Sequence, residues 1–261
     1  MPKFSANLTM LFGEVSFEQR FAASKEAGFH YVEYMFPYDY EAQELSAYLK
    51  KNDLKQVLFN LPAGNWTEGD RGIAAHPERI DEFRQGVDRA LEYAKVLNVD
   101  LINCLVGKQI EGVSQSQQWK VLVENLAYAA EKLASDNRLL LIEPINTFDI
   151  PGFLLSTTRQ GIELIKEVKA DNLKIQYDVY HMQKMEGNLV STIEANLERI
   201  GHIQIADNPG RHQPGTGEIN YRFVLEAIDK MGYEGYIGLE YIPEPDTKAS
   251  LSWIESLGFS L

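Results

Sequence analysis

The chain has 261 residues, 44% of them hydrophobic, and a formal net charge of −13. We expect one folded domain over residues 1–261, because no low-complexity tract or run of like charge marks a boundary. The acidic excess argues against nucleic acid as a partner, since binding to phosphates requires clustered lysine and arginine. No apolar run approaches the roughly 20 residues that span a bilayer, and the N-terminus lacks a cleavage-like end. We therefore expect a cytoplasmic protein without a membrane partner.

Short apolar segments alternate with longer amphipathic stretches along the whole chain. The predicted strands are 3–10, 30–36, 54–60, 100–106, 139–144, 173–178, 202–207 and 236–241. The predicted helices are 17–27, 40–51, 77–97, 117–134, 157–168, 188–199, 221–231 and 248–257. Eight strand–helix units in this length predict a (β/α)8 TIM barrel. An open doubly wound sheet is the alternative, although no glycine-rich phosphate fingerprint follows the first strand.

Single residues refine this pattern. Gly28, Gly201 and Gly232 follow the first, sixth and seventh predicted helices, where a left-handed glycine ends a helix without strain. The one cysteine, Cys104, lies in an apolar strand and is predicted to pack in the core. A single thiol leaves neither a disulfide framework nor a thiolate zinc site.

Four consecutive predicted strands end in a side chain with an oxygen that can bind a metal: Glu143, Asp178, Gln204 and Glu240. Each gap between them has room for one helix and two loops, so parallel strands would present the four side chains at a common rim. Three carboxylates this close would resist ionising together unless a cation lay among them. Oxygen ligands favour Mg²⁺ or Mn²⁺ over zinc, with Co²⁺ as a substitute. We therefore predict one divalent metal ion.

Such a site suits a compound with a hydroxyl group next to a carbonyl. A hard cation can bind both oxygens and stabilise the enediolate that forms when the carbon loses a proton. Two glutamates, Glu143 and Glu240, then divide the proton transfers: one removes the proton and the other returns it. His181 follows Asp178 by three positions and either donates to a substrate oxygen or serves as a further ligand. A hydride shift usually requires a second metal and a lysine, and the sequence offers no obvious candidate for either.

Six segments are typical of a small group of sugar-acid isomerases: FSANLTMLF, VEYMFPYDY, LIEPINTFDIPGF, IQYDVYHMQ, HIQIADNPGRHQPGTGEINY and GYEGYIGLEYIP. Through them the chain resembles, over essentially its whole length, the hydroxypyruvate isomerase family of the xylose isomerase-like (β/α)8 superfamily. The resemblance implies that Glu143 and Glu240 are the acid/base pair and that His181 and Arg211 contact the substrate. It also implies the same metal ligands: Glu143, Asp178, Gln204 and Glu240.

Related ketose 3-epimerases help to place two further positions. They carry the pattern E-x-L-N-x-F-E after the fifth strand, and EPINTFD in this chain puts Asp149 where their second glutamate stands. Asp149 is therefore a candidate substrate contact. The same epimerases usually have histidine at the position of Gln204, which favours the hydroxypyruvate isomerase family over them.

The implied reaction interconverts hydroxypyruvate and tartronate semialdehyde (2-hydroxy-3-oxopropanoate) and needs no organic cofactor. The expected partner is thus a small hydroxy or oxo acid, whose carboxylate requires a cationic contact. Arg211 lies in a loop rich in proline and glycine after the seventh strand and is our candidate, whereas Glu218 in the same loop is assigned a structural role. Phe36, Tyr38 and Trp66 either narrow the pocket or pack in a dimer interface, which leaves a homo-oligomer open.

Four alternative functions compete with this one. A 2-oxo-tetronate isomerase would use the same chemistry on a four-carbon acid, and a ketose 3-epimerase would use the same metal and glutamates. A noncatalytic sugar-acid-binding barrel would be expected to lack a metal ligand, and none is missing. A metallo-nuclease with three zinc ions needs many histidines, and this chain has five in all.

Overall fold

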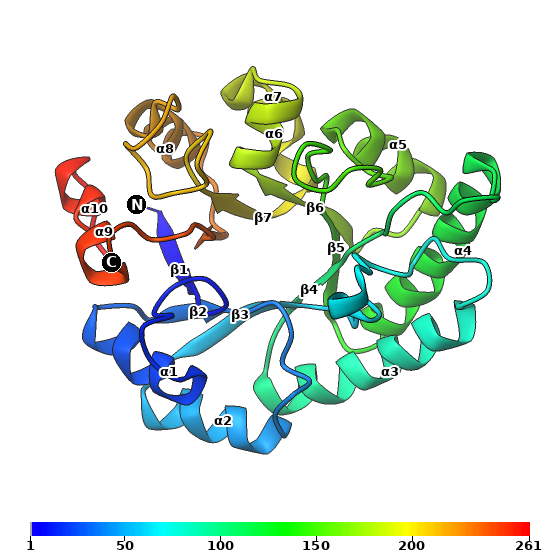
Figure 1. Ribbon diagram of the computed structural model, residues 1–261, viewed down its shortest axis with the longest axis horizontal. Helices are drawn as coiled ribbons and strands as arrows, with labels where there is room; N and C mark the ends of the chain where they lie inside the picture. Colours follow the sequence, from blue (N-terminus) through cyan, green and yellow to red (C-terminus); the bar gives the residue numbers. More distant parts are fainter. Residues whose placement is uncertain (1) are drawn as a thin grey trace.

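The computed structural model describes residues 2–261, and their strands form one closed, parallel barrel. Neighbours in the chain are neighbours in the barrel, and β8 pairs with β1 to close it. Figure 1 shows the strands on the inside and the helices around them. The strands are β1 (Lys3–Asn7), β2 (Tyr31–Glu33), β3 (Lys55–Asn60), β4 (Leu101–Cys104), β5 (Leu139–Ile142), β6 (Leu173–Asp178), β7 (Ile200–Ile205) and β8 (Tyr236–Leu239).

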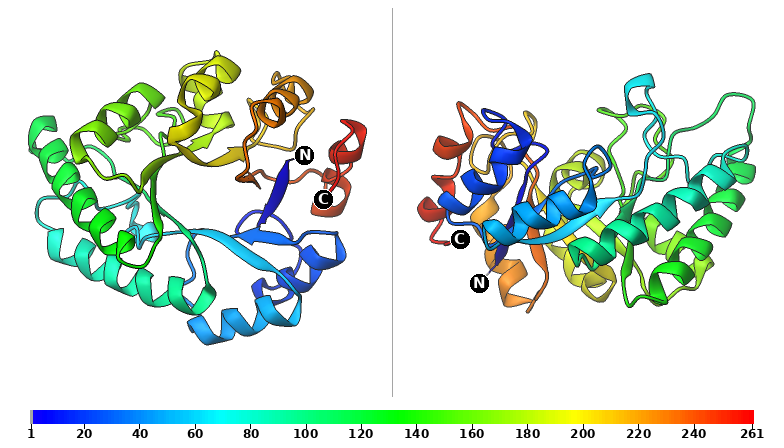
Figure 2. Two further views of the ribbon diagram at one scale, coloured as in Figure 1. Left: turned by 180° about the vertical axis from the view of Figure 1, so that it is seen from behind. Right: turned by 90° about the horizontal axis from the view of Figure 1, so that it is seen from below.

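Helices connect the strands and cover the outside of the barrel (Figures 1 and 2). Local sequence starts several of them: the hydroxyl of Thr157 accepts from the backbone of Gln160 in a capping box at the start of α5. The helices are α1 (Phe17–Glu26), α2 (Ala42–Lys51), α3 (Ile80–Leu97), α4 (Gln115–Ala134), α5 (Thr158–Val168), α6 (Val179–Met185), α7 (Leu189–Asn196), α8 (Tyr221–Lys230), α9 (Thr247–Ser250) and α10 (Trp253–Ser256), with 3-10 turns η1 (Trp66–Glu68) and η2 (Leu197–Arg199).

The TIM barrel predicted from the sequence is confirmed, and the open sheet is wrong. Three local predictions also differ from the structure. Helix α6 was not predicted and starts directly after β6. Gly201 does not end a helix but lies inside β7, where an added Cβ would come within 2.6 Å of the Leu141 side chain. The predicted last helix, 248–257, is divided into α9 and α10. Gly28 and Gly232 do adopt the left-handed backbone, with φ of 103° and 76°.

The barrel interior changes from apolar to polar along the strands. Side chains near the strand starts form a separate apolar cluster that includes Leu101, Leu141 and Tyr236. Alternate residues of a strand face the same side, so the next side chain that points into the barrel lies two positions further along each strand. At this level the inward side chains are polar and buried, and Gln176 and His202 are examples. The apolar cluster therefore closes one end of the barrel, and the other end holds buried polar groups.

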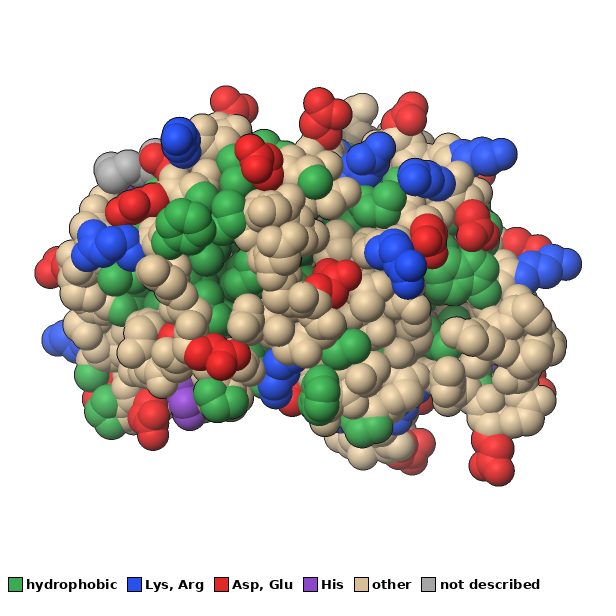
Figure 3. All heavy atoms as spheres, turned by 90° about the horizontal axis from the view of Figure 1, so that it is seen from above, with side chains coloured by type: hydrophobic (Ala, Val, Ile, Leu, Met, Phe, Trp, Pro, Cys, Tyr) green, Lys and Arg blue, Asp and Glu red, His purple; other side chains and the backbone are tan. Residues whose placement is uncertain are grey.

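The remaining apolar side chains lie mostly between the strands and the helices. Cys104 belongs to this core, as predicted, and burial raises the pKa of its thiol to about 12. On the face seen in Figure 3, acidic and basic side chains are interspersed rather than gathered by sign. In the part of the chain that the structure describes, no helix is both long enough and apolar enough to cross a bilayer.

Candidate active site

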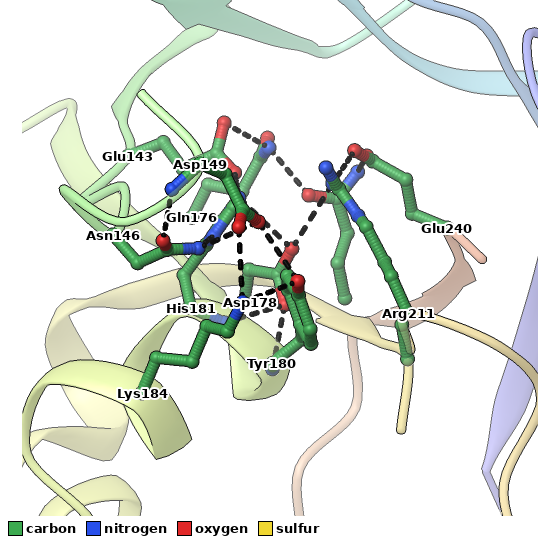
Figure 4. Close-up of polar contacts among 12 residues, drawn as sticks. Glu143, Asn146, Asp149, Gln176, Asp178, Tyr180, His181, Lys184, Arg211 and Glu240 are labelled. Atoms are coloured by element: carbon green, nitrogen blue, oxygen red, sulfur yellow. Dashed lines mark hydrogen bonds and ion pairs between the residues drawn. The ribbon is translucent and has the colours of Figure 1, made fainter. Parts of the chain in front are cut away.

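The structure brings the four predicted metal ligands together at the carboxyl ends of the last four strands. Glu143 follows β5, Asp178 is the last residue of β6, Gln204 lies near the end of β7, and Glu240 follows β8. All four are at most 5% exposed. Figure 4 shows Glu143 and Glu240 on opposite sides of Asp178. Glu143, Gln204 and Glu240 line a cavity of about 90 Å³.

Buried amides join the carboxylates into one network. Gln176 Nε2 donates to Glu143 Oε2 at 2.9 Å and to Gln204 Oε1 at 2.6 Å. Asn103 also donates to Glu143 Oε2, at 3.1 Å, and Asn7 donates to Glu240 Oε2 at the same distance. The sequence analysis missed these amides. Gln176 lies two positions before Asp178 and therefore faces the same side of the strand, which is the signal in the sequence that could have identified it.

Asp178 has two different roles. Its Oδ1 accepts from the backbone N–H of Tyr180 at 2.8 Å and of His181 at 3.4 Å, which caps α6. Its Oδ2 is buried and has no hydrogen-bond partner among residues 2–261. Ligand-type atoms of Glu143, Asp178 and His181 all lie within 4.8 Å of one another. A buried carboxylate oxygen without a partner, in a group of this kind, fits a divalent cation.

The electrostatics of the two glutamates also fit a cation. Burial raises the pKa of Glu143 well above its usual range, and the charges of Glu240 and Asp178 add to this effect. Burial likewise raises the pKa of Glu240 to about 8, although Arg211 acts in the opposite direction. A divalent ion would reverse both shifts, because it stabilises the ionised forms.

His181 faces the carboxylates with Nε2, which lies 3.6 Å from Asp178 Oδ2 and 3.8 Å from Glu143 Oε1. Burial lowers its pKa to about 4, so the ring is neutral at neutral pH. Asn146 Oδ1 accepts from the backbone of Phe148 and Asp149, which leaves its Nδ2 to contact His181 Nδ1 at 2.6 Å. The proton of the ring then lies on Nε2. This tautomer favours a hydrogen-bond donor over a metal ligand.

Arg211 reaches the site from the loop after β7. Its Nη2 donates to Glu240 Oε1 at 2.6 Å and lies 3.8 Å from Asp178 Oδ2. Together with Glu143 these carboxylates raise the Arg211 pKa, although burial alone would lower it. The Arg211 backbone has φ of 57°, an uncommon conformation for a residue with a Cβ. Backbone hydrogen bonds to Asp207 O and from Ile242 N, each 2.8 Å, hold it there.

Asp207 organises the rest of this loop. Its carboxylate accepts from the backbone N–H groups of Gly215, Gly217 and Ile219 at 2.8 to 3.1 Å. Glu218 accepts from Asn208 in the loop and from Gln183 in α6. Both contacts agree with the structural role expected for Glu218. The loop that carries Arg211 is therefore built on a buried carboxylate.

Asp149, the other predicted substrate contact, lies beside the cluster (Figure 4). It accepts from Asn146 at 3.0 Å, Tyr180 at 2.8 Å and Lys184 at 2.9 Å. Burial alone would raise the Asp149 pKa, but these contacts lower it to about 2. Lys184, on the unpredicted helix α6, is a second cation close to the site that the sequence analysis missed.

The three aromatic residues considered from the sequence have different positions. Trp66 lines the cavity, together with apolar side chains such as Met35, Leu105 and Ile150. Phe36 packs against Trp66, with 5.2 Å between the ring centroids. Tyr38 instead packs on Phe59 and Tyr93. Of the three, Trp66 is thus the one that narrows the cavity.

The sequence matches a known protein family over most of its length. The family model of the xylose isomerase-like TIM barrel matches residues 21–257. The chain belongs to the xylose isomerase-like TIM-barrel family. Two curated proteins match it over nearly their whole length.

The chain is 54% identical to hydroxypyruvate isomerase of Escherichia coli (strain K12), with 98% of this chain and 99% of that protein covered. It is 45% identical to 2-oxo-tetronate isomerase of Cupriavidus necator, with 98% of each covered. A solved structure described as an AP endonuclease of family 2, from Brucella melitensis, superposes with a TM-score of 0.96 at 41% identity and covers 98% of this chain and 99% of that one. By name, the two curated relatives are both isomerases.

Proposed function

We propose that this xylose isomerase-like protein is a hydroxypyruvate isomerase that interconverts hydroxypyruvate and tartronate semialdehyde. One observation carries the proposal. Glu143 and Glu240 lie buried on two sides of Asp178, in a chain that is 54% identical to hydroxypyruvate isomerase of E. coli. Two glutamates on two sides of one site can divide the work, one taking a proton from carbon and the other returning one.

The proposed metal ligands are Glu143, Asp178, Gln204 and Glu240, and the proposed ion is Mg²⁺ or Mn²⁺. The partnerless oxygen of Asp178 supports an ion at this place. When bound, the metal would hold two adjacent substrate oxygens and stabilise negative charge on them. No organic cofactor takes part in the proposed reaction.

The protein groups then move the protons. One of the two glutamates takes a proton from C3 of hydroxypyruvate, and the other delivers a proton to C2. The hydroxyl proton passes from O3 to O2, so that the product has an aldehyde at C3 and a hydroxyl at C2. His181 offers its Nε2 proton to a substrate oxygen, and its low pKa keeps it neutral while it does so.

Arg211 and Asp149 are further proposed substrate contacts, and Arg211 lines the cavity. Arg211 supplies the positive charge that binds the substrate carboxylate. Because Arg211 also contacts Glu240, a carboxylate bound there would lie next to one of the two proposed acid/base residues. Asp149 is proposed to accept from a substrate hydroxyl, and its contacts with Lys184 and Tyr180 support this by holding it ionised beside the carboxylate cluster. Both assignments rest on the positions of these side chains around the carboxylate cluster (Figure 4).

The sequence identities favour the three-carbon acid over the four-carbon 2-oxo-tetronate, since the chain is 54% identical to the hydroxypyruvate isomerase of E. coli and 45% identical to the 2-oxo-tetronate isomerase of C. necator. A ketose 3-epimerase is disfavoured by Gln204, because the related epimerases usually have histidine at this position. A nuclease with three zinc ions is disfavoured as well, because it needs many histidines. Among the described residues, His181 is the one histidine grouped with Glu143 and Asp178.

Proton NMR in D₂O tests the proposal. Metal-stripped protein and protein restored with Mg²⁺ or Mn²⁺ are incubated with hydroxypyruvate, with 2-oxo-tetronate and with a neutral ketose. We expect metal-dependent formation of tartronate semialdehyde with deuterium on carbon, faster than reaction of the other two. Faster conversion of 2-oxo-tetronate would move the assignment to the four-carbon acid. Epimerised ketose would indicate a 3-epimerase, and no exchange on any substrate would contradict the isomerase.

Three broader statements belong to the same proposal. We propose that residues 1–261 form one domain, because one barrel uses strands from Lys3 to Leu239. We also propose a cytoplasmic location, which cell fractionation tests. A homo-oligomer is a further possibility to be tested by light scattering, since Phe148 and Phe223 are 72% and 59% exposed.

A further inference from the structure

A further buried carboxylate lies beneath the candidate active site. Glu33 ends β2 and is 0% exposed. A shift in strand register between Val32 and Glu33 accompanies its position inside the barrel. Opposite it, β8 carries Gly238, where an added Cβ would come within 2.4 Å of Glu33 Oε1. The barrel thus leaves space for this side chain at a point where a residue larger than glycine would collide with it.

Three side chains donate to the carboxylate of Glu33, and His202 lies close to it without making a hydrogen bond among the described residues. Ser5 Oγ donates to Oε2 at 2.6 Å, and His202 Nε2 lies 2.9 Å from the same oxygen. Gln204 Nε2 donates to Oε1 at 2.8 Å, and Asn7 contributes a longer contact of 3.4 Å. None of the functions described above uses Glu33 or His202.

The contact with Gln204 determines which way its amide faces. The oxygen and nitrogen of an amide are nearly equal in size, so packing alone does not distinguish two orientations related by a half turn. In the other orientation Gln204 Oε1 would lie against the carboxylates of Glu33 and Glu240. With Nε2 on that side, Oε1 faces Gln176 and, through it, Glu143.

We propose that Glu33 is a positioning residue, which fixes the amide of Gln204 so that its oxygen faces the metal site. The inference rests on the proposed function, because Gln204 is a metal ligand only there. Glu240 accepts from the same nitrogen but takes part in the proposed chemistry, whereas Glu33 does not. Glu33 therefore holds the orientation independently of the reaction. Groups that orient a metal ligand in this way commonly change metal affinity by about 10- to 100-fold when they are replaced.

The experiment measures Mn²⁺ binding by electron paramagnetic resonance, without substrate, in four purified proteins. They are the parent protein, Glu33→Gln, the exchange variant with Glu33→Gln and Gln204→Glu, and Glu186→Gln. Glu186 is an exposed glutamate that accepts from Thr158 in another part of the protein, so it controls for the chemical change itself. The melting temperature of each protein is recorded, so that unfolding is not mistaken for weak binding.

We expect Glu33→Gln to weaken Mn²⁺ binding by about 10-fold or more, since the introduced amide no longer imposes one orientation on Gln204. The exchange variant should recover binding, because both oxygens of a carboxylate at position 204 can serve the metal and the amide at position 33 can donate to it. Glu186→Gln should bind like the parent. Equal affinities of Glu33→Gln and the parent, or an exchange variant no better than Glu33→Gln, would overturn the inference. A parent protein that does not bind Mn²⁺ would overturn the proposed metal site as well.

Discussion

Glu240 is held in one position at the candidate active site. Arg211 donates to one of its oxygens, and Asn7 and Gln204 donate to the other. Replacing it with glutamine keeps an oxygen for the metal but removes the exchangeable proton. We expect turnover of hydroxypyruvate to fall by at least about 10²-fold in Glu240→Gln. Steady-state kinetics with saturating metal measures this.

The same replacement at a nearby exposed glutamate shows whether the loss of turnover is specific to Glu240. Glu244 lies a few residues further along the same loop, with its side chain 65% exposed. Glu244→Gln should retain nearly the activity of the parent. Near-parental turnover in Glu240→Gln would contradict the acid/base assignment.

Arg211 is predicted to distinguish charged from neutral substrates. Arg211→Ala should raise KM for carboxylated substrates far more than KM for a neutral ketose, because the proposed carboxylate contact is lost. Its kcat should fall as well, since Glu240 loses its ion pair. Initial rates over a range of substrate concentrations separate the two effects, with Arg222→Ala, a half-exposed arginine on α8, as the control. An equal rise in KM for both substrate types would show that Arg211 does not bind the carboxylate.

Among single residues, those at the strand ends could be predicted from the sequence, but the polar residues deeper in the barrel could not. Glu143 and Glu240 are recognisable because an apolar run ends in a charge. Gln176 and His202 lie within β6 and β7, where only the period of two relates them to the residues at the strand ends. Glu33 lies inside the predicted strand 30–36 and has no such signal. Only closure of the barrel brings Glu33 of β2 next to Gln204 of β7.

Among the elements, the loop after β7 depends on one side chain. Asp207 accepts three backbone N–H groups of residues 215–219, and its own carbonyl accepts from Arg211. Asp207→Ala would leave those amides without their partner, at a cost of about 1–3 kcal/mol for each one that stays buried. We expect faster proteolysis within residues 208–218 and a lower kcat/KM, because Arg211 is no longer held at the site.

Ser114→Ala offers a control for this change. It removes a single backbone contact at the exposed start of α4 and should alter neither proteolysis nor kcat/KM appreciably. If Asp207→Ala is cleaved no faster than Ser114→Ala, the loop does not depend on this carboxylate.

Helix α6 shows why element boundaries were harder to predict than element types. A strand normally runs into a loop before the next helix, but here Asp178 is both the last residue of β6 and the cap of α6. The sequence DVYHMQ continues without glycine or proline, so nothing local marks the change. The eight-fold alternation, in contrast, is repeated often enough to predict the barrel despite errors at individual ends.

For the whole molecule, the two buried glutamates link stability to pH. Both have pKa values above the usual 4.5 in the folded, metal-free protein. The folded state thus holds protons that the unfolded state releases. The stabilisation from Glu240 is complete below about pH 4.5 and is lost as the pH rises through about 8, and Glu143 acts in the same direction. We expect the melting temperature of metal-free protein to fall between about pH 6 and about pH 9, where each kcal/mol corresponds to about 2–4 °C.

Calorimetry with and without Mg²⁺ checks this expectation. The ion should raise the melting temperature more at the higher pH, because fewer protons then compete for the carboxylates. The variant with both Glu143→Gln and Glu240→Gln should show a flatter dependence on pH. A parent protein whose metal-free stability is constant across this range would contradict the raised pKa values.

Closure of the barrel through β1 and β8 has a consequence for how the protein is made. Translation proceeds from the N-terminus, so Asn7 is made long before Glu240, its partner across the closing seam. A nascent chain that has exposed β6 already carries Glu143 and Asp178 but has no closed interior in which to bury them. The polar cluster can therefore be completed only after β8 has been synthesised.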